Sequence, residues 1–270
     1  MSALSPRPPS VLTIAGSDSG GGAGIQADLK TFAAHGIHGL SAIAALTAQH
    51  TRGVTAVHAP PVAFLRAQID ACFDDFDIRA VKIGMLATAD IVHAVADALD
   101  AHPDVPVVLD PVMIATSGAK LLDDDALDAL RTRLVPRASV LTPNIPEAEL
   151  LLGHAIVDAA AADAALDALR ALGAQGVLLK GGHLDEGDTV IDRYADPDTR
   201  LAHRGPRLAV DGHGTGCTLS SAIAARIAGG ASAAEACGAA IAYVHAAMRA
   251  AYRPGRSDIS VLGHLAARIQ

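Results

Sequence analysis

Apolar and polar positions alternate along this chain in two patterns with different periods. Short continuous apolar runs, such as VLTIAG at 11–16 and VPVVLD at 105–110, are separated by stretches with the three-to-four-residue spacing of amphipathic helices. Continuous apolar strands between helices are typical of a parallel sheet that is covered on both faces. Because this alternation recurs about six times, the sequence predicts an α/β fold.

The boundaries of the predicted elements follow from the same pattern. The predicted helices cover about 23–35, 61–73, 89–100, 123–134, 159–172, 214–229 and 232–251. The predicted strands are the apolar runs at 11–16, 41–48, 54–59, 80–85, 105–110, 139–144 and 176–180. No repeat or low-complexity linker interrupts this order. It therefore predicts a disordered N-terminal tail over 1–9 and a single domain over 10–270.

Two segments depart from the alternation. Residues 188–196 and 199–208 follow each other without a helix and predict antiparallel edge strands joined by a turn at Asp196-Pro197-Asp198. Residues 46–60 are polar and β-prone, and predict a small lid, an edge insertion or a dimer contact. The predicted sheet is therefore mostly parallel, with antiparallel strands at its edges.

Composition narrows the class of protein. The net charge is −8, and no cluster of basic residues with interleaved aromatics occurs, which argues against a nucleic-acid surface. Three scattered cysteines fit a reducing cytosol better than a disulfide framework. Arg226, Gly229-Gly230 and Glu235 interrupt the apolar C-terminal half short of a membrane-spanning length. We therefore expect a soluble cytoplasmic protein with no nucleic-acid or membrane partner.

Two glycine-rich loops each follow a strand or polar stretch and open a predicted helix. These are GSDSGGGAG at 16–24 and DGHGTGC at 211–217. Backbone N–H groups at a helix start bind anions, so the second loop predicts a phosphate site formed by Gly214, Thr215, Gly216 and Cys217. Cys217 would lie at the mouth of this site, where its pKa is expected to be lowered. The alternative is a flexible turn beside a small buried cysteine. Neither loop fits the Walker pattern or G-x-G-x-x-G.

Polar residues follow the predicted strands at the edge where ligands gather in such sheets. Asp110 and Glu147 supply the hard oxygens that Mg²⁺ prefers, and Lys180 supplies a point charge for phosphate. Taken singly, each residue has an alternative explanation: Asp110 as a turn former at a strand end, Glu147 as an acid in the first turn of a helix, and Lys180 as a solvated lysine. Lys82 lies inside an apolar run and is expected to pair with a carboxylate or carbonyl group.

Seven motifs, in this order and spacing, resemble one enzyme family. They are GSDSGGGAGIQADLKTF, TAQHTRGV, VKIGML, VVLDPVM, TPNIPEAE, LLKGGH and GHGTGCTLSSAIAA. They resemble the hydroxymethylpyrimidine/phosphomethylpyrimidine kinases of thiamine biosynthesis, which belong to the ribokinase-like superfamily, over about residues 10–250. The resemblance implies a three-layer α/β/α fold. It also implies two ATP- and Mg²⁺-dependent phosphorylations, first of 4-amino-5-hydroxymethyl-2-methylpyrimidine and then of its monophosphate.

The resemblance also implies a role for individual residues. The pyrimidine would be held by Gly16, Ala23, Asp28, Gln49, Met85 and Val112. Lys180, Asn144 and Gly214 would bind ATP, and Asp110 and Glu147 would organise Mg²⁺. Gly214, Thr215 and Gly216 would form the anion hole, with Cys217 as the base that accepts the hydroxymethyl proton. A homodimer is the expected assembly.

Some positions differ from the family pattern. Asp211-Gly212 stands where Asn-Thr is usual, Ser19-Gly20 replaces Pro-Ser, and His50 stands where Asn is common. The extra carboxylate of Asp211 is expected to weaken ATP binding or to change the choice of nucleotide. The nearest rival is a pyridoxal kinase. Gln49 and Met85 favour the aminopyrimidine over pyridoxal as the acceptor. The other rivals are a non-catalytic pyrimidine or nucleotide sensor and a dehydrogenase.

Overall fold

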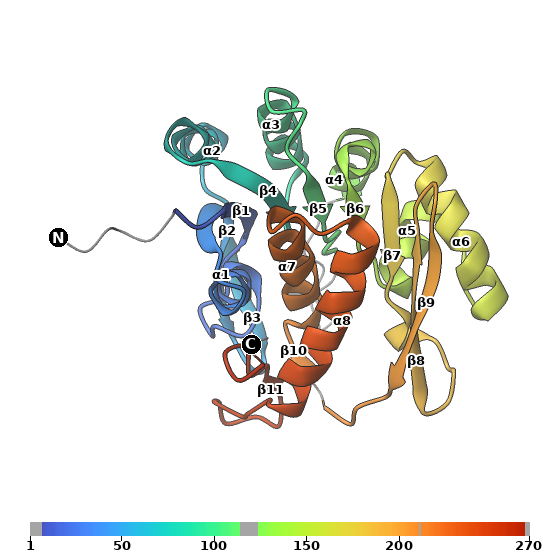
Figure 1. Ribbon diagram of the computed structural model, residues 1–270. Helices are drawn as coiled ribbons and strands as arrows, with labels where there is room; N and C mark the ends of the chain where they lie inside the picture. Colours follow the sequence, from blue (N-terminus) through green and yellow to red (C-terminus); the bar gives the residue numbers. More distant parts are fainter. Residues whose placement is uncertain (1–6, 114–123, 211, 268–270) are drawn as a thin grey trace.

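A nine-stranded sheet runs through the computed structural model, which describes residues 7–113, 124–210 and 212–267 (Figure 1). The strand order is β3-β2-β1-β4-β5-β6-β7-β8-β9. Strands β2, β1, β4, β5, β6 and β7 are parallel, whereas β3, β8 and β9 are antiparallel to their neighbours. The predicted mostly parallel sheet with antiparallel edges is therefore confirmed.

The strands are short in the centre of the sheet and longer toward its edges. Their bounds are β1 Ser10–Gly16, β2 His38–His50, β3 Gly53–His58, β4 Ile78–Ile83, β5 Val107–Leu109, β6 Val140–Leu141, β7 Gly176–Leu179, β8 Thr189–Ala195 and β9 Arg200–Pro206. The predicted edge insertion at 46–60 is the hairpin of β2 and β3, and its action as a lid stays a prediction. The turn predicted at Asp196-Pro197-Asp198 joins β8 to β9, where Asp196 accepts the backbone N–H groups of Asp198 and Thr199.

Helices cover both faces of the sheet. Their bounds are α1 Gly24–Ala34, α2 Val62–Asp75, α3 Ala89–Asp100, α4 Asp124–Ala129, α5 Ile145–Leu152, α6 Ala159–Ala171, α7 Thr215–Ala228 and α8 Ala233–Arg249. One core lies between the sheet and helices α2 to α6, and a second lies between the sheet and α1, α7 and α8. This is the predicted three-layer α/β/α architecture, built with small side chains that allow close helix–sheet contact.

One predicted helix changes type along its length, and one helix was not predicted. The helix predicted over 123–134 is α4 only as far as Ala129, and it continues as a π-helical turn over Leu130–Leu134. Helix α5 was not predicted, because a run of eight residues that begins with Ile145-Pro146 is too short for the helical period to show. Its start did carry a signal, since Asn144 and Glu147 form a capping box.

The C-terminal segment packs against the second glycine-rich loop. The sequence predicts no element in this segment. A two-residue strand β11 (Ser260–Val261) pairs in parallel with β10 (Gly212–His213). His264 Nε2 lies 2.9 Å from the Thr218 hydroxyl in the first turn of α7. Within the described residues, we find no helix that is both long and apolar enough to cross a membrane. Residues 1–6 of the predicted tail lie outside the described residues.

Candidate active site

Two cavities meet at the start of α7. The larger, of about 640 Å³, contains Asp110, Asn144, Glu147, Lys180 and the loop Gly214–Cys217 in its lining. The smaller, of about 90 Å³, has Gly16, Ala23, Gln49 and Met85 in its lining. Val112, Gly214 and Cys217 line both. The residues predicted for ATP and metal therefore gather in one cavity, and most of those predicted for the pyrimidine gather in the other.

The larger cavity contains a buried cluster of charges at the ends of three strands. Lys180 Nζ lies 3.0 Å from Asp110 Oδ1 and 3.6 Å from Glu147 Oε2. Burial by itself would lower the pKa of Lys180, but the two carboxylates outweigh it and raise that pKa above its ordinary value. Lys180 is therefore a permanent cation. In contrast, burial raises the pKa of Glu147 despite the neighbouring ammonium.

The backbone fixes this cluster. Asn144 and Lys180 form a β-bridge just beyond β6 and β7, so their side chains start from adjacent positions. Asn144 Oδ1 accepts the N–H of Glu147, while Glu147 Oε2 accepts the N–H of Asn144 at 2.8 Å. Asp110 is only 1% exposed, and its Oδ2 has no hydrogen-bond partner among the described residues. One buried carboxylate oxygen is therefore left for a ligand.

Helix α7 directs its N-terminus at the same cluster. Its first residue follows Gly214, which has φ 83°, and no side chain caps the helix start. A Cβ atom on Gly216 would lie 3.2 Å from Lys180 Nζ and 3.4 Å from Asp110 Oδ2, so a side chain at this position would crowd the charged cluster. Backbone N–H groups at a helix start favour an anion. The arrangement supports the predicted anion hole.

Cys217 lies half-buried in the first turn of α7, as predicted, but its acidity is not as predicted. Burial raises the pKa of the Cys217 thiol to about 11, and the nearby Lys82 ammonium and the Gly24 N–H oppose that rise only in part. The expected fall in pKa is therefore wrong for the free protein. The low-dielectric surroundings outweigh the helix N-terminus, whose effect is confined to one turn.

Asp28 does not occupy the position that the resemblance implied. It is fully buried beneath the smaller cavity, on α1, and is not among the residues that line it. Its carboxylate accepts hydrogen bonds from Thr13 (2.6 Å), Ser221 (2.7 Å) and the Lys82 ammonium (2.9 and 3.0 Å). Each carboxylate oxygen thus has two partners within the protein, which leaves Asp28 a supporting role rather than a direct contact with a ligand.

Comparison with known proteins identifies the family. A family model described as phosphomethylpyrimidine kinase matches residues 18–262. The chain belongs to this family. It is a phosphotransferase, and ATP is the co-substrate of such a kinase.

Two curated relatives agree with this family. The chain is 52% identical, over 244 residues, to a hydroxymethylpyrimidine/phosphomethylpyrimidine kinase of Rhizobium meliloti (strain 1021), with 90% of this chain and 91% of that protein covered. It is 49% identical to a thiamine biosynthesis bifunctional protein of Geobacter sulfurreducens, with 96% of this chain and 53% of that protein covered.

A solved structure shows the same fold with a different name. The ADP complex of Bacillus subtilis pyridoxal kinase has a TM-score of 0.88 and 33% identity, and the match covers 97% of this chain and 99% of that one. The fold and the kinase chemistry are therefore shared between relatives with different acceptors.

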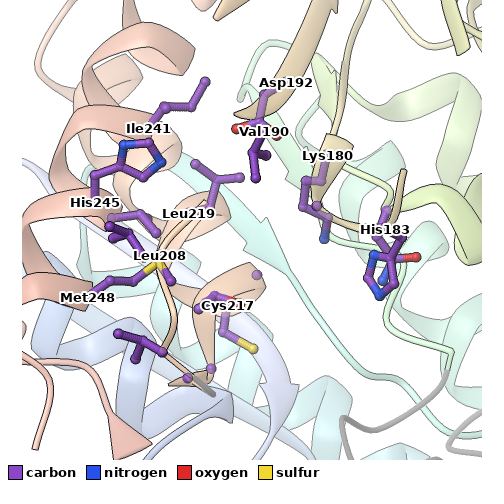
Figure 2. Close-up of a pocket in the computed structure, with 18 of the residues that line it drawn as sticks. Lys180, His183, Val190, Asp192, Leu208, Cys217, Leu219, Ile241, His245 and Met248 are labelled. Carbon is purple, nitrogen blue, oxygen red and sulfur yellow. The ribbon is translucent and has the colours of Figure 1, made fainter. Parts of the chain in front are cut away.

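One wall of the kinase's larger cavity is formed by residues that belong to none of the sequence motifs. Figure 2 shows Leu208, Ile241, His245 and Met248 close together, with Lys180 and His183 across the cleft. These side chains come from the segment after β9 and from α8, which are distant in sequence from the charged cluster. An apolar wall opposite a cationic end suits a flat base at one end of a nucleotide and phosphates at the other.

Lys82 pairs with a carboxylate, as predicted. It is 0% exposed, like its partner Asp28, and it lines the floor of the smaller cavity. Burial would lower the pKa of Lys82, but the Asp28 carboxylate outweighs it and raises that pKa. Lys82 therefore stays charged inside the kinase.

Removing one member of this pair is expected to destabilise the fold strongly. Lys82→Met leaves the Asp28 carboxylate buried without its cation, which should lower the free energy of unfolding by about 3–5 kcal/mol. Denaturant titration measures this loss. Arg66→Met, which breaks the exposed pair with Asp70, is the matched control and should cost less than about 1 kcal/mol. Equal losses in the two variants would contradict the buried role of Lys82.

Proposed function

We propose that this kinase transfers the γ-phosphoryl group of ATP to 4-amino-5-hydroxymethyl-2-methylpyrimidine, and then a second phosphoryl group to the resulting monophosphate, as a step of thiamine biosynthesis. The observation that carries the proposal is the meeting of two cavities at Cys217 and Gly214. A nucleotide in the larger cavity and an acceptor in the smaller one would face each other across the start of α7.

The chain's own residues support the transfer mainly by position and charge. Lys180 and the N-terminus of α7 would neutralise the phosphoryl oxygens as negative charge spreads over them. Gln49 and Met85 would hold the ring, so that its hydroxymethyl group points toward Cys217. Cys217 in its thiolate form would accept the hydroxyl proton late in the transfer, since a loose transition state needs little help from a base before the phosphoryl group has moved.

Mg²⁺ fits the charged cluster. Asp110 Oδ2 is a buried carboxylate oxygen with no partner in the described part of the chain, and it lies beside the start of α7. Asp110 and Glu147 would hold the ion, directly or through water, and the ion would supply positive charge that favours the binding of phosphates. Carboxylate oxygens are the donors that magnesium prefers.

Pyridoxal is the second candidate acceptor, because the pyridoxal kinase of Bacillus subtilis shares the fold at 33% identity. The higher identity of 52% to a hydroxymethylpyrimidine/phosphomethylpyrimidine kinase favours the pyrimidine. The test is a comparison of kcat/KM for the pyrimidine and for pyridoxal at saturating Mg-ATP. We expect the pyrimidine to be preferred by at least about tenfold, the effect of one matched hydrogen bond. A preference for pyridoxal would overturn the assignment of the acceptor.

Two further predictions belong to this proposal. A cytoplasmic location fits a kinase that draws on cellular ATP and has three free cysteines. A homodimer fits the exposed apolar side chains Leu46, Val57 and Phe64, which lie on the β2–β3 hairpin and at the start of α2. The mass of the protein in solution tests the second prediction. Asp211, with its expected effect on nucleotide choice, lies outside the described residues.

A further inference from the structure

His213 joins the two glycine-rich loops at the wall of the smaller cavity. Its Nε2 lies 3.3 Å from Asp18 Oδ2 and 2.8 Å from the amide nitrogen of Gln49. Asp18 is only 2% exposed, and its two oxygens also accept the backbone N–H groups of Gly20 and Gly22. His213 is therefore held against a carboxylate that the first loop itself keeps in place, and Gln49 lies next to it.

The protons around Thr47 decide which way the Gln49 amide points. Thr47 Oγ1 lies 2.7 Å from the Ser17 carbonyl oxygen and 3.0 Å from Gln49 Oε1. A hydroxyl has one proton, and the closer carbonyl oxygen can only accept it. The hydroxyl oxygen is then left to accept a hydrogen bond from Gln49. A half turn of the amide, which exchanges its oxygen and nitrogen with little movement, supplies the N–H that this requires.

The same half turn of the Gln49 amide also gives His213 a consistent set of hydrogen bonds. With the amide nitrogen toward His213, Nε2 must present its lone pair, and that lone pair also faces the Asp18 carboxylate with no proton between them. With the amide oxygen toward His213, a proton on Nε2 is shared between Gln49 and Asp18, and every donor meets an acceptor. The pKa of Asp18 agrees with this. Burial raises it, but the hydrogen bond from His213 and those from the loop lower it to about 2.

We propose that His213, held by Asp18, orients the Gln49 amide so that its oxygen accepts the amino group of an aminopyrimidine and its free N–H donates to the adjacent ring nitrogen. Gln49 and His213 both line the smaller cavity. After His213 and Thr47 are satisfied, the amide keeps one lone pair and one N–H for a ligand. His213 is thus a positioning residue that acts through Gln49.

This orientation distinguishes the two candidate acceptors. Beside its hydroxymethyl group, the aminopyrimidine presents an amino donor and then a ring-nitrogen acceptor. Pyridoxal presents an aldehyde oxygen, which accepts, and then a hydroxyl group, which donates. The order of donor and acceptor is reversed, so an amide locked by His213 matches the first and opposes the second. The inference rests on the proposed function, since it explains how that site chooses its acceptor.

The test combines variants of His213 with a change in the acceptor. We compare kcat and KM for the aminopyrimidine and for its analogue without the amino group, in the wild type, His213→Leu and His213→Gln. The wild type should lose about tenfold or more in kcat/KM on removal of the amino group, and His213→Leu should lose little. His213→Leu should raise KM for the aminopyrimidine about tenfold with kcat and the KM for ATP nearly unchanged. His213→Gln, which keeps an N–H at the same position, should restore most of this loss. The exposed His58→Leu is the matched control.

Each result bears on the proposal. Undiminished discrimination in His213→Leu would overturn the role of His213 alone. Absence of any transfer to the aminopyrimidine by the wild type would overturn the proposed function as well. If His213→Leu does not fold, the variant Thr47→Val and a nitrogen NMR spectrum of the wild type test the proposed orientation of the Gln49 amide. Thr47→Val should reduce discrimination, and the spectrum should show the proton of His213 on Nε2. A bare Nε2 would contradict the proposal.

Discussion

Replacing Lys180 with methionine is expected to lower kcat/KM for ATP by about 10²–10³-fold, the cost of removing one fixed positive group from a developing anionic charge. Lys180 is the cation of the charged cluster, since its ammonium lies 3.0 Å from Asp110 and 3.6 Å from Glu147. Without it, two buried carboxylates face the phosphates and repel them. Steady-state kinetics with varied Mg-ATP measure the loss.

One comparison separates charge from packing at this position. Lys180→Arg keeps the charge on a larger head and should recover part of the activity. Lys180→Met also leaves the buried Asp110 and Glu147 carboxylates without their cation, so its unfolding temperature is expected to fall, and the kinetics are measured at a temperature at which the variant is folded. If Lys180→Met kept nearly full activity, the phosphates would have to bind elsewhere, and the larger cavity would lose its assignment.

Replacing Cys217 with alanine is expected to lower kcat by at least about tenfold, with the KM for both substrates nearly unchanged. The Cys217 sulfur would act only while the proton is transferred, so substrate binding should not depend on it. Removing a general base typically lowers the rate 10²–10⁴-fold. The minimum loss expected here is smaller than that range, because the pKa of the thiol is about 11 and little of it is ionised at neutral pH. Cys72→Ala, on α2 and outside the lining of both cavities, is the control and should keep full activity.

The raised pKa of Cys217 has a direct signature in alkylation. Only the thiolate reacts, so below a pKa of about 11 the rate of alkylation of Cys217 by iodoacetamide should rise about tenfold for each pH unit from pH 7 to 9. Peptide mass spectrometry distinguishes Cys217 from the other cysteines. A rate that levels off near neutral pH would show that the helix N-terminus outweighs burial after all. Full turnover in Cys217→Ala would remove the thiol from the mechanism.

The fold was largely predictable because its signal is local. Helix α3 begins and ends at the predicted residues 89 and 100, since Thr88 caps it and its apolar positions keep the helical period. The strand at 11–16 is buried along its whole length, as a continuous apolar run requires. The shortest elements were missed, because a few residues are too short to show a local pattern. Strands β10 and β11 are two residues each, and they exist only because the C-terminal segment returns to the second loop.

The site was predictable where residues follow strand ends and not where distant side chains decide. Asp110, Asn144, Glu147 and Lys180 do gather in one cavity, because parallel strands end at one edge. Asp28 carries a signal only for helix α1, and its partners Thr13, Lys82 and Ser221 come from three other elements. The acidity of Cys217 depends on burial by the whole fold, which no local motif records.

The most direct test of this account is a single-turnover measurement of phosphoryl transfer from γ-labelled Mg-ATP, with the aminopyrimidine and its monophosphate offered separately and the products separated by mass. We expect label to pass to both, giving the monophosphate and the diphosphate, because one junction between the two cavities serves both. Cys217→Ala should slow the first step more than the second, because only the hydroxymethyl acceptor gives up a proton, whereas the monophosphate is already ionised at neutral pH. Transfer to neither pyrimidine by the wild type would contradict the central claim, whatever the fold and its relatives have in common.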